Sequence, residues 1–441
     1  MITKDKKELL LKRLAEISST GTLDGEDADR RENMHRLFMY PAMMVPATQT
    51  AIIKVFADVV GDIQNAIDPF MGSGTSLLSC MEFGLDVFGQ DINPFAVLLS
   101  KAKTTAYDEA ELKEAYLKII SHISSDVSES IDIHFGSLDK WFTREAQISF
   151  SKIRRAIQSI EDKSIRYFFW VLMSEAIRVG SNDRTSTFKL HRRSEDELSH
   201  RKVDVIKEFF SISKRGIDDY VLFKSKLKQE HHADNFDFRG NREIVWGDTL
   251  QKIETDNKFN LLVSSPPYGD NHTTVTYGQS SYLPLQWIDP ADVSCPYDYI
   301  KTTQEIDRLS LGGRIDRRKL SEKSSVLFKK SKSVRDFIEK IPDNEKPKYN
   351  KTLAFMADFD DSLDHIVNAM SNDAFFIWTI GNRFVGGREV PNAEVLQDLM
   401  QYRGYSLFFR AERQILNKKQ PKKNNFSKTM EKEVILIFHK E

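Results

Sequence analysis

Short apolar segments that end in glycine, proline or aspartate alternate along this chain with segments of helical periodicity, and this alternation is what most constrains the fold. Residues 65–70 (NAIDPF) have the pattern of a buried strand, and a helix pattern follows at 76–84. A second strand pattern at 86–92 is followed by a helix pattern at 94–104. Strands that alternate with helices form a mostly parallel, doubly wound sheet, so the sequence predicts an α/β fold.

The carboxyl-terminal half of the chain continues this pattern. Its predicted elements are strands at residues 242–248, 259–268 and 374–382 and a helix at 392–404. The last two strand patterns, at 405–416 and 433–440, have no helix between them. We therefore expect them to close the sheet as an antiparallel hairpin.

Two long stretches interrupt the alternation and divide the chain into parts. Residues 1–34 are predicted to be an N-terminal helical segment, followed after a short link by an apolar helix at 48–60. The sheet domain is expected to comprise residues 35–105, 241–289 and 349–441. Residues 106–240 are expected to be a helical insertion, with helices near 108–124, 144–161, 164–179 and 202–228. Residues 290–348 form a polar and basic insertion with few apolar runs.

Composition excludes several classes of protein. The 441 residues carry 64 Lys or Arg and 65 Asp or Glu, a net charge of −1, which excludes a histone-like blanket of positive charge. The two cysteines, Cys80 and Cys295, exclude a disulfide scaffold and a cysteine-rich zinc site. The ten histidines are scattered, with His231 and His232 in a polar loop, so no metal site is expected. The amino terminus lacks the apolar stretch of a signal peptide, which predicts a cytoplasmic protein with no membrane association.

Four of the predicted strands end in polar motifs that can bind a ligand. The first is DPFMGSGT at residues 68–75, where glycines let backbone N–H groups approach a ligand at a helix start. The second is GQDINP at 89–94, whose carboxylate can accept both ribose hydroxyls of a nucleoside. The third is Gly247-Asp248, and the fourth is SSPPY at 264–268, where two prolines stiffen a loop. A tight turn, a helix N-cap and a rigid turn are the purely structural alternatives.

Together, in this order, these motifs resemble the amino-methyltransferases, enzymes that use S-adenosylmethionine to methylate exocyclic amines of DNA bases. The segment YPAMMVP at residues 40–46 is similar to the part of such enzymes that closes over the methionine end of the cofactor. The resemblance implies a class I methyltransferase-like fold in which the sheet domain is the cofactor-binding catalytic domain. It also implies that both insertions are candidates for contact with DNA.

The resemblance further implies which residues bind S-adenosylmethionine. Asp91 would hold the ribose, Ile92 would pack on the adenine, and Asp248 would accept the adenine amino group. Phe70, Gly72 and Gly74 would line the methionine. The remaining expected cofactor residues are Tyr40, Pro41, Asp68 and Thr75.

The expected catalytic residues are Ser265, Pro266, Pro267 and Tyr268. The exocyclic nitrogen of a base is a poor nucleophile, and the Ser265 hydroxyl and the Pro266 carbonyl can accept hydrogen bonds from its N–H groups. Tyr268 offers a π-face to a base that has been taken out of the stack. Carbon-5 cytosine methylation needs a thiolate nucleophile in a Pro-Cys pair, which this sequence does not contain.

Basic residues gather in three places that could contact DNA phosphates. Residues 314–351 contain 13 Lys or Arg and 6 Asp or Glu, and a solvated disordered loop is the alternative interpretation. The second place is residues 181–193, and the third is the group Lys418, Lys419, Lys422 and Lys423. The DNA-binding residues that we predict from the first two places are Arg317, Arg318, Lys319, Arg184, Lys189, Arg192 and Arg193. Residues 272–287 could shape the base pocket, where Tyr277 and Tyr282 fit either a pocket or a core position.

The prediction for function is a site-specific DNA methyltransferase that acts on the N4 amine of cytosine. Ser265 before Pro-Pro-Tyr favours cytosine, because relatives with serine there mostly act on cytosine. The alternatives are adenine-N6 methylation of DNA, methylation of an RNA base, and a catalytically silent DNA-recognition subunit. The resemblance implies a prokaryotic, nucleoid-associated protein whose partner is double-stranded DNA. A cognate restriction endonuclease is a further partner that it allows.

Overall fold

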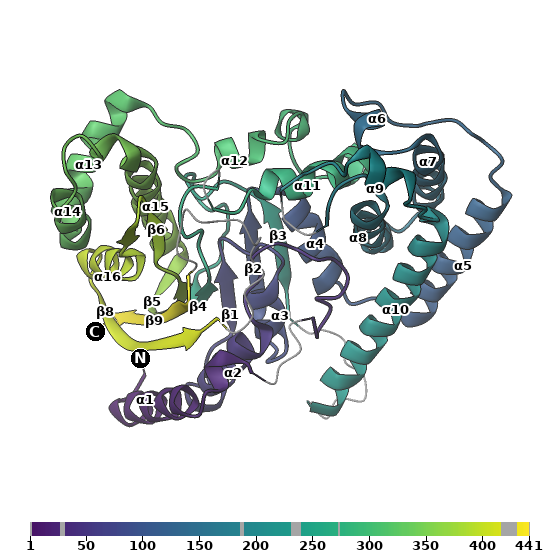
Figure 1. Cartoon of the computed structure of the whole chain (residues 1–441). Helices are drawn as coiled ribbons and strands as arrows, with labels where there is room; N and C mark the ends of the chain where they lie inside the picture. The colour runs from purple at the N-terminus through teal and green to yellow at the C-terminus, as the bar shows by residue number, and fades with distance from the viewer. Residues whose placement is uncertain are drawn as a thin grey trace.

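The computed structural model describes residues 2–26, 31–185, 189–230, 240–271, 274–415 and 430–440. Its centre is a seven-stranded sheet with the order β3-β2-β1-β4-β5-β9-β8 (Figure 1). The strands are β1 (Asn65–Asp68), β2 (Asp86–Asp91), β3 (Arg242–Trp246), β4 (Phe259–Ser264), β5 (Met370–Ile380), β8 (Tyr405–Gln414) and β9 (Lys432–Lys440). Strands β1 to β5 run parallel to one another, and β9 is antiparallel to both β5 and β8.

This topology confirms the predicted α/β fold with its closing antiparallel hairpin. Strand β1 lies between β2 and β4, so the chain reverses its winding direction there, and open α/β sheets generally bind ligands at the carboxyl ends of the strands next to such a reversal. Strands β1 and β4 are shorter than predicted. They end at Asp68 and Ser264, shortly before Pro69 and Pro266, which have no N–H to donate to a strand ladder.

Helices cover both faces of the sheet. In β5, Phe375 and Ile377 belong to the apolar core on one face, while Phe376 and Trp378 belong to the core on the other. This alternation follows from the two-residue period of a strand. The first face is covered by α2 (Pro46–Val59), α3 (Thr75–Met81) and α4 (Pro94–Thr104), with α1 (Lys4–Ser19) against α2. The second is covered by α15 (Asn350–Ala369) and α16 (Asn392–Tyr402).

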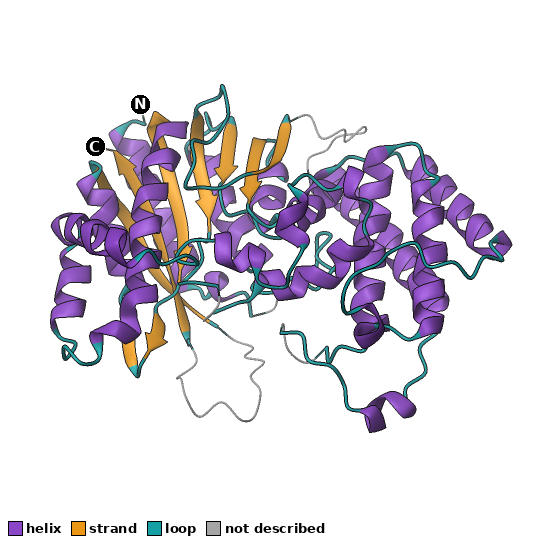
Figure 2. Ribbon diagram, turned by 90° about the horizontal axis from the view of Figure 1, so that it is seen from above, coloured by secondary structure: helices purple, strands orange, loops and turns teal. Residues whose placement is uncertain are grey.

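The described residues between 106 and 240 form a lobe of helices at one end of the sheet (Figure 2). They are α5 (Glu109–Ser125), α6 (Leu138–Trp141), α7 (Arg144–Gln158), α8 (Lys163–Gly180), α9 (Glu195–Ser199) and α10 (Val205–Glu230). The four predicted helices are confirmed as α5, α7, α8 and α10. Helix α8 packs on α4, and one apolar core runs without a break from the sheet into this lobe.

Residues 290–348 are folded, so the alternative of a solvated disordered loop is wrong. They contain α12 (Glu305–Leu309), α13 (Arg317–Lys330) and α14 (Lys332–Glu339), and α11 (Tyr277–Trp287) precedes them. Helix α13 packs on α15 and α14 packs on α16 (Figure 1). The few apolar residues, among them Leu327, Val334 and Ile338, are buried in the second core. Helix α15 and a small hairpin of β6 (Arg383–Val385) and β7 (Arg388–Val390) were not predicted.

Some sequence predictions fall on residues that the structure does not describe. Lys418, Lys419, Lys422, Lys423, His231 and His232 lie outside the described residues. In the part of the chain that is described, no helix has the length and apolarity needed to cross a membrane. Across the same residues, no three His, Cys, Asp or Glu side chains are grouped so that they could hold a metal ion.

Candidate active site

Loops that follow four neighbouring strands meet at the carboxyl edge of the sheet. The backbone N–H of Gly72, after β1, donates to Asp91 Oδ2 at the end of β2 at 2.9 Å. The N–H of Gly247, after β3, donates to the Asp91 carbonyl at 3.2 Å. The Ser264 hydroxyl, at the end of β4, donates to Asp68 Oδ1 at 2.6 Å. The fold therefore brings the four sequence motifs together at one site.

The loop between β1 and α3 is shaped by two glycines with left-handed backbone angles. Gly72 has φ 50° and Gly74 has φ 75°, and Thr75 begins α3 directly afterwards. A Cβ on Gly74 would lie 2.9 Å from Ser100 Oγ and 3.3 Å from Ser100 Cβ, so a larger residue there would require the Ser100 side chain to move, in addition to the strain of the left-handed backbone. The loop carries its backbone N–H groups to the start of a buried helix, an arrangement suited to a negative or polar ligand group.

Asp91 connects this loop to β2 and keeps some of its capacity to accept hydrogen bonds. Its Oδ1 accepts the Asn93 N–H at 2.8 Å and its Oδ2 accepts the Gly72 N–H at 2.9 Å. Each carboxylate oxygen can accept a second hydrogen bond, so two hydroxyl donors can still be bound. Burial raises the pKa of Asp91 to about 6, although the three backbone N–H groups around it favour the ionised form.

Tyr40 borders the same loop. Its ring stacks on Tyr277 at a centroid separation of 5.6 Å, and Cε1 would lie 3.6 Å from a Cβ on Gly72. The Tyr40 hydroxyl accepts a hydrogen bond from Asn93 Nδ2 at 3.1 Å. Burial, with the charge of Asp91 as a second cause, raises the pKa of Tyr40 and keeps the phenol neutral. Tyr277 thus belongs to this site, whereas Tyr282 is a buried residue packed against Phe135.

Asp68 has a different environment from the one expected of a cofactor ligand. It is fully buried, and it accepts hydrogen bonds from the Ser264 hydroxyl, the Ser76 hydroxyl and the Phe70 N–H. These contacts connect the glycine loop and α3 to the end of β4, just before the SSPPY loop. In this structure Asp68 therefore ties two loops of the site together.

Replacing Asp68 with asparagine should reduce the pH dependence of stability. Burial raises the pKa of Asp68 to about 6, above its usual 3.8, so the folded protein binds the proton more tightly than the unfolded chain. This contribution is complete below the unfolded pKa and is lost as the pH rises through about 6, and it amounts to roughly 3 kcal/mol. In urea unfolding at pH 4.5 and 7.5, the free energy of unfolding should fall less between the two pH values in Asp68→Asn than in the wild type. An identical loss in both proteins would contradict this assignment.

The other expected cofactor residues surround the loop in different ways. Phe70 packs against Phe359, and the Ile92 carbonyl accepts a hydrogen bond from Trp246 Nε1 at 2.9 Å. Asp248 Oδ1 accepts the Leu250 N–H at 3.0 Å, and partial burial raises the pKa of Asp248. Pro41 and Thr75 are buried.

The SSPPY loop is held by residues that the sequence did not identify. The Tyr268 hydroxyl lies 3.1 Å from Ser265 Oγ and 2.9 Å from Glu433 Oε1 on β9. Asn392 Nδ2, at the start of α16, donates to the Tyr268 carbonyl at 3.0 Å and to the Gly381 carbonyl at 2.9 Å. Burial, with the Glu433 charge as a second cause, raises the pKa of Tyr268 well above 10. No sequence motif marks Glu433 or Asn392, because both are ordinary polar residues at the ends of their elements.

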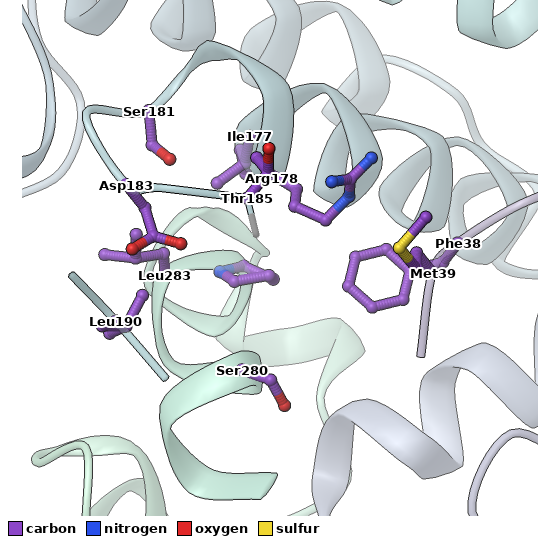
Figure 3. Close-up of a pocket in the computed structure, with 11 residues that line it drawn as sticks. Phe38, Met39, Ile177, Arg178, Ser181, Asp183, Thr185, Leu190, Ser280 and Leu283 are labelled. Atoms are coloured by element: carbon purple, nitrogen blue, oxygen red, sulfur yellow. The ribbon is translucent and has the colours of Figure 1, made fainter. Parts of the chain in front are cut away.

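A separate pocket lies between α8 and α11 (Figure 3). It is lined by Phe38 and Met39 from the segment before Tyr40, by Arg178 of α8, by Leu190 and by Leu283 of α11, among other residues. At about 50 Å³ it has room for a few water molecules. Neither the glycine loop nor Tyr268 lines it, so it is distinct from the site at the sheet edge.

The basic residues predicted near 181–193 are partly neutralised within the protein. Arg184 Nη2 lies 2.8 Å from Glu197 Oε2, and Arg192 Nη1 lies 2.5 Å from Glu195 Oε1. Both glutamates lie in α9, whose first turn carries three acidic residues. Arg193 Nε is buried without a hydrogen-bond partner among the described residues, and Lys189 is exposed.

The second basic group lies at the start of α13. Asp316 caps the helix and accepts the backbone N–H groups of Arg318 and Lys319 at 3.0 and 3.4 Å. The Arg318 and Lys319 side chains are exposed, and the Arg317 side chain lies outside the described part of the chain. Positive charge at a helix start is unfavourable for the helix by about 0.3–1 kcal/mol. Helix stability therefore does not account for these residues.

Comparison with known proteins shows which proteins the whole chain is similar to. No family model matches the chain. The chain is 29% identical over 430 residues to the Type II methyltransferase M.MvaI of Kocuria varians, covering 93% of this chain and 92% of that protein. It is also 31% identical over 153 residues to the Type II methyltransferase M.MjaII of Methanocaldococcus jannaschii, covering 32% of this chain and 28% of that protein. The chain is therefore similar to two Type II methyltransferases, and its similarity to the first extends over nearly the whole of both proteins.

Proposed function

We propose that this protein is a site-specific DNA methyltransferase that transfers a methyl group from S-adenosylmethionine to the N4 amine of cytosine. The observation that carries the proposal is the meeting of Asp91, the glycine loop and the Ser265–Tyr268 loop at one edge of the sheet. Its relatives, both Type II methyltransferases, support methyl transfer.

The residues around the glycine loop fit S-adenosylmethionine. Asp91 keeps acceptor capacity for two ribose hydroxyls, and the left-handed Gly72 and Gly74 leave the backbone open to the methionine end. Tyr40, beside Gly72, and Asp248, which follows β3, add an aromatic and an acidic group near the carboxyl ends of the strands. When bound, S-adenosylmethionine supplies an electrophilic methyl group.

The SSPPY loop has the groups needed to orient an amine. A target amine donates two hydrogen bonds, and the Ser265 hydroxyl and the Pro266 carbonyl are acceptors on a loop stiffened by two prolines. Asn392 and Glu433 restrain Tyr268 from two sides, so its ring is held ready for a flipped-out base. A fixed acceptor geometry lowers the reorganisation that the reaction requires.

The preference for cytosine over adenine rests on Ser265. A serine in this position is more common in relatives that act on cytosine, while both bases present an amine beside a ring acceptor. Adenine-N6 methylation is therefore the alternative within the same fold, followed by methylation of RNA. The intact Ser265–Tyr268 loop and its buried contacts argue against a silent recognition subunit, which would not need them.

Product analysis tests the proposal directly. The purified protein is incubated with tritiated S-adenosylmethionine and with unmethylated DNA or RNA, and the nucleosides are then separated by mass spectrometry. We expect N4-methyldeoxycytidine as the labelled product with DNA, and no labelled product with RNA. N6-methyladenine as the sole product would overturn the choice of base, and no label in any nucleic acid would overturn the function. Sequencing the methylated DNA gives the target site.

Charge reversal at the start of α13 should weaken DNA binding at every sequence. In Arg317→Glu/Arg318→Glu/Lys319→Glu we expect a flatter dependence of affinity on salt, because fewer counterions are released. Acidic residues suit the first turn of a helix, so α13 should remain folded. A control is the double reversal Lys12→Glu/Arg13→Glu on α1, which lies at the bottom of the molecule in Figure 1, whereas α13 lies at the top. If the salt dependence is unchanged, residues 181–193 become the better candidate for phosphate contact.

A further inference from the structure

A chain of polar contacts runs from the SSPPY loop to the closing hairpin. Ser265 Oγ lies 3.1 Å from the Tyr268 hydroxyl, which lies 2.9 Å from Glu433 Oε1. The other carboxylate oxygen of Glu433 accepts Arg413 Nε at 2.7 Å and Nη2 at 2.6 Å. Arg413 and Glu433 are direct cross-strand partners on β8 and β9, and the Arg413 side chain is only 5% exposed. The pair is therefore held firmly and is mostly shielded from water.

The chemistry of these groups fixes the direction of every hydrogen bond in the chain. A carboxylate paired with arginine only accepts hydrogen bonds, so the Tyr268 hydroxyl must donate its single proton to Glu433. Tyr268 can then only accept from Ser265, although either hydroxyl could otherwise be the donor in that contact. The Ser265 proton is consequently directed at Tyr268, and the lone pairs of Ser265 Oγ remain for another partner.

We propose that Glu433, held in place by Arg413, is a positioning residue that makes the Ser265 hydroxyl an acceptor for the exocyclic amine of the target base. This inference rests on the proposed function and adds a determinant of its specificity. Glu433 does not touch the base and acts through Tyr268.

The consequence is a preference for a base with an amine over its oxo counterpart. An amine donates a hydrogen bond to Ser265 Oγ, whereas the oxo group of uracil or hypoxanthine is an acceptor and would face a second acceptor. A site built to pair with one group rejects an analogue that cannot make the bond. If the Ser265 proton were free, the hydroxyl could turn and donate to the oxo group instead.

The test compares the affinity of the wild type and three variants for matched duplexes at the methylation site. One duplex carries the target base, and the other carries uracil in place of cytosine, or hypoxanthine in place of adenine. We expect the wild type to prefer the amine-bearing duplex by at least tenfold. Tyr268→Phe and Glu433→Gln should each reduce this preference by about tenfold. In the Tyr268→Phe background, Glu433→Gln should cause no further reduction, because the chain is already broken.

Two controls separate this role from a structural one. Glu433→Gln leaves the shielded Arg413 charge without its carboxylate and could unfold the hairpin, whereas Tyr268→Phe breaks the chain and keeps the ion pair. Glu412→Gln removes an exposed ion pair with Lys432 on the same two strands and should leave the preference unchanged. An unchanged preference in Tyr268→Phe, with methylation by the wild type intact, would overturn the inference alone. A wild type that methylates no nucleic acid would overturn the proposed function and this inference together.

Discussion

Ser265→Ala and Tyr268→Ala should each lower the rate of methyl transfer by about 10²–10³-fold while cofactor affinity changes less than about threefold. Removing one preorganised hydrogen-bonding group from an active site has an effect of this size. Ser265 supplies an acceptor for the amine, and Tyr268 supplies both a stacking surface and the hydroxyl that orients Ser265. Both residues follow β4, whereas the expected ribose ligand Asp91 ends β2. The two variants should therefore lower the rate of methyl transfer without a comparable loss of cofactor affinity.

Single-turnover methylation and calorimetric titration with S-adenosylmethionine measure the two effects. Ser371→Ala is a matched control, because Ser371 lies near the start of β5, whereas Ser265 follows the carboxyl end of the neighbouring parallel strand β4. It should retain the wild-type rate. A Ser265→Ala enzyme with the wild-type rate would remove Ser265 from the catalytic machinery.

Asp91→Ala should weaken S-adenosylmethionine binding by at least about 100-fold. The carboxylate would lose two charge-assisted hydrogen bonds to the ribose, each contributing roughly 1.5–3 kcal/mol. The variant would also release the Gly72 and Asn93 N–H groups, which shape the glycine loop and orient the partner of Tyr40. Both effects act in the same direction on cofactor affinity.

Calorimetry with S-adenosylmethionine measures this loss, and circular dichroism checks that the fold remains. Asp86→Ala is the matched control, because Asp86 is an acid at the opposite end of the same strand. It should bind the cofactor with wild-type affinity. Wild-type affinity in Asp91→Ala would exclude Asp91 as the ribose ligand.

The positions of the strands and most helices of the α/β domain could be predicted from local pattern. Strands β2 and β9 and helices α4, α8 and α10 appear within a few residues of their predicted positions, because each buries a continuous apolar face. Helices α13 and α15 were not predicted, and for α13 the reason lies in its composition. Residues 317–330 are strongly polar, and Leu327 is buried only because α15 lies beneath it.

The loops at the strand ends could also be recognised in the sequence, because glycines, prolines and carboxylates at strand ends have local conformational and chemical preferences. The motifs, through their resemblance to the amino-methyltransferases, implied a cofactor loop and a catalytic loop with named residues. They could not separate a residue that faces a ligand from one that ties two loops together. Asp68 reads as a member of the cofactor motif, and its three partners from separate elements are found only in the folded chain.

Tertiary structure alone decided which groups hold the Ser265–Tyr268 loop. Glu433 is 165 residues from Tyr268, and Asn392 is 124 residues from it. No periodic pattern or motif in the sequence reveals either contact, because contacts between distant segments depend on how the whole sheet is assembled. The sequence determined the chemistry available at the end of each strand. The packing of β9 beside β5, and of β8 beside β9, determined that the Glu433 carboxylate pairs with Arg413 and contacts Tyr268.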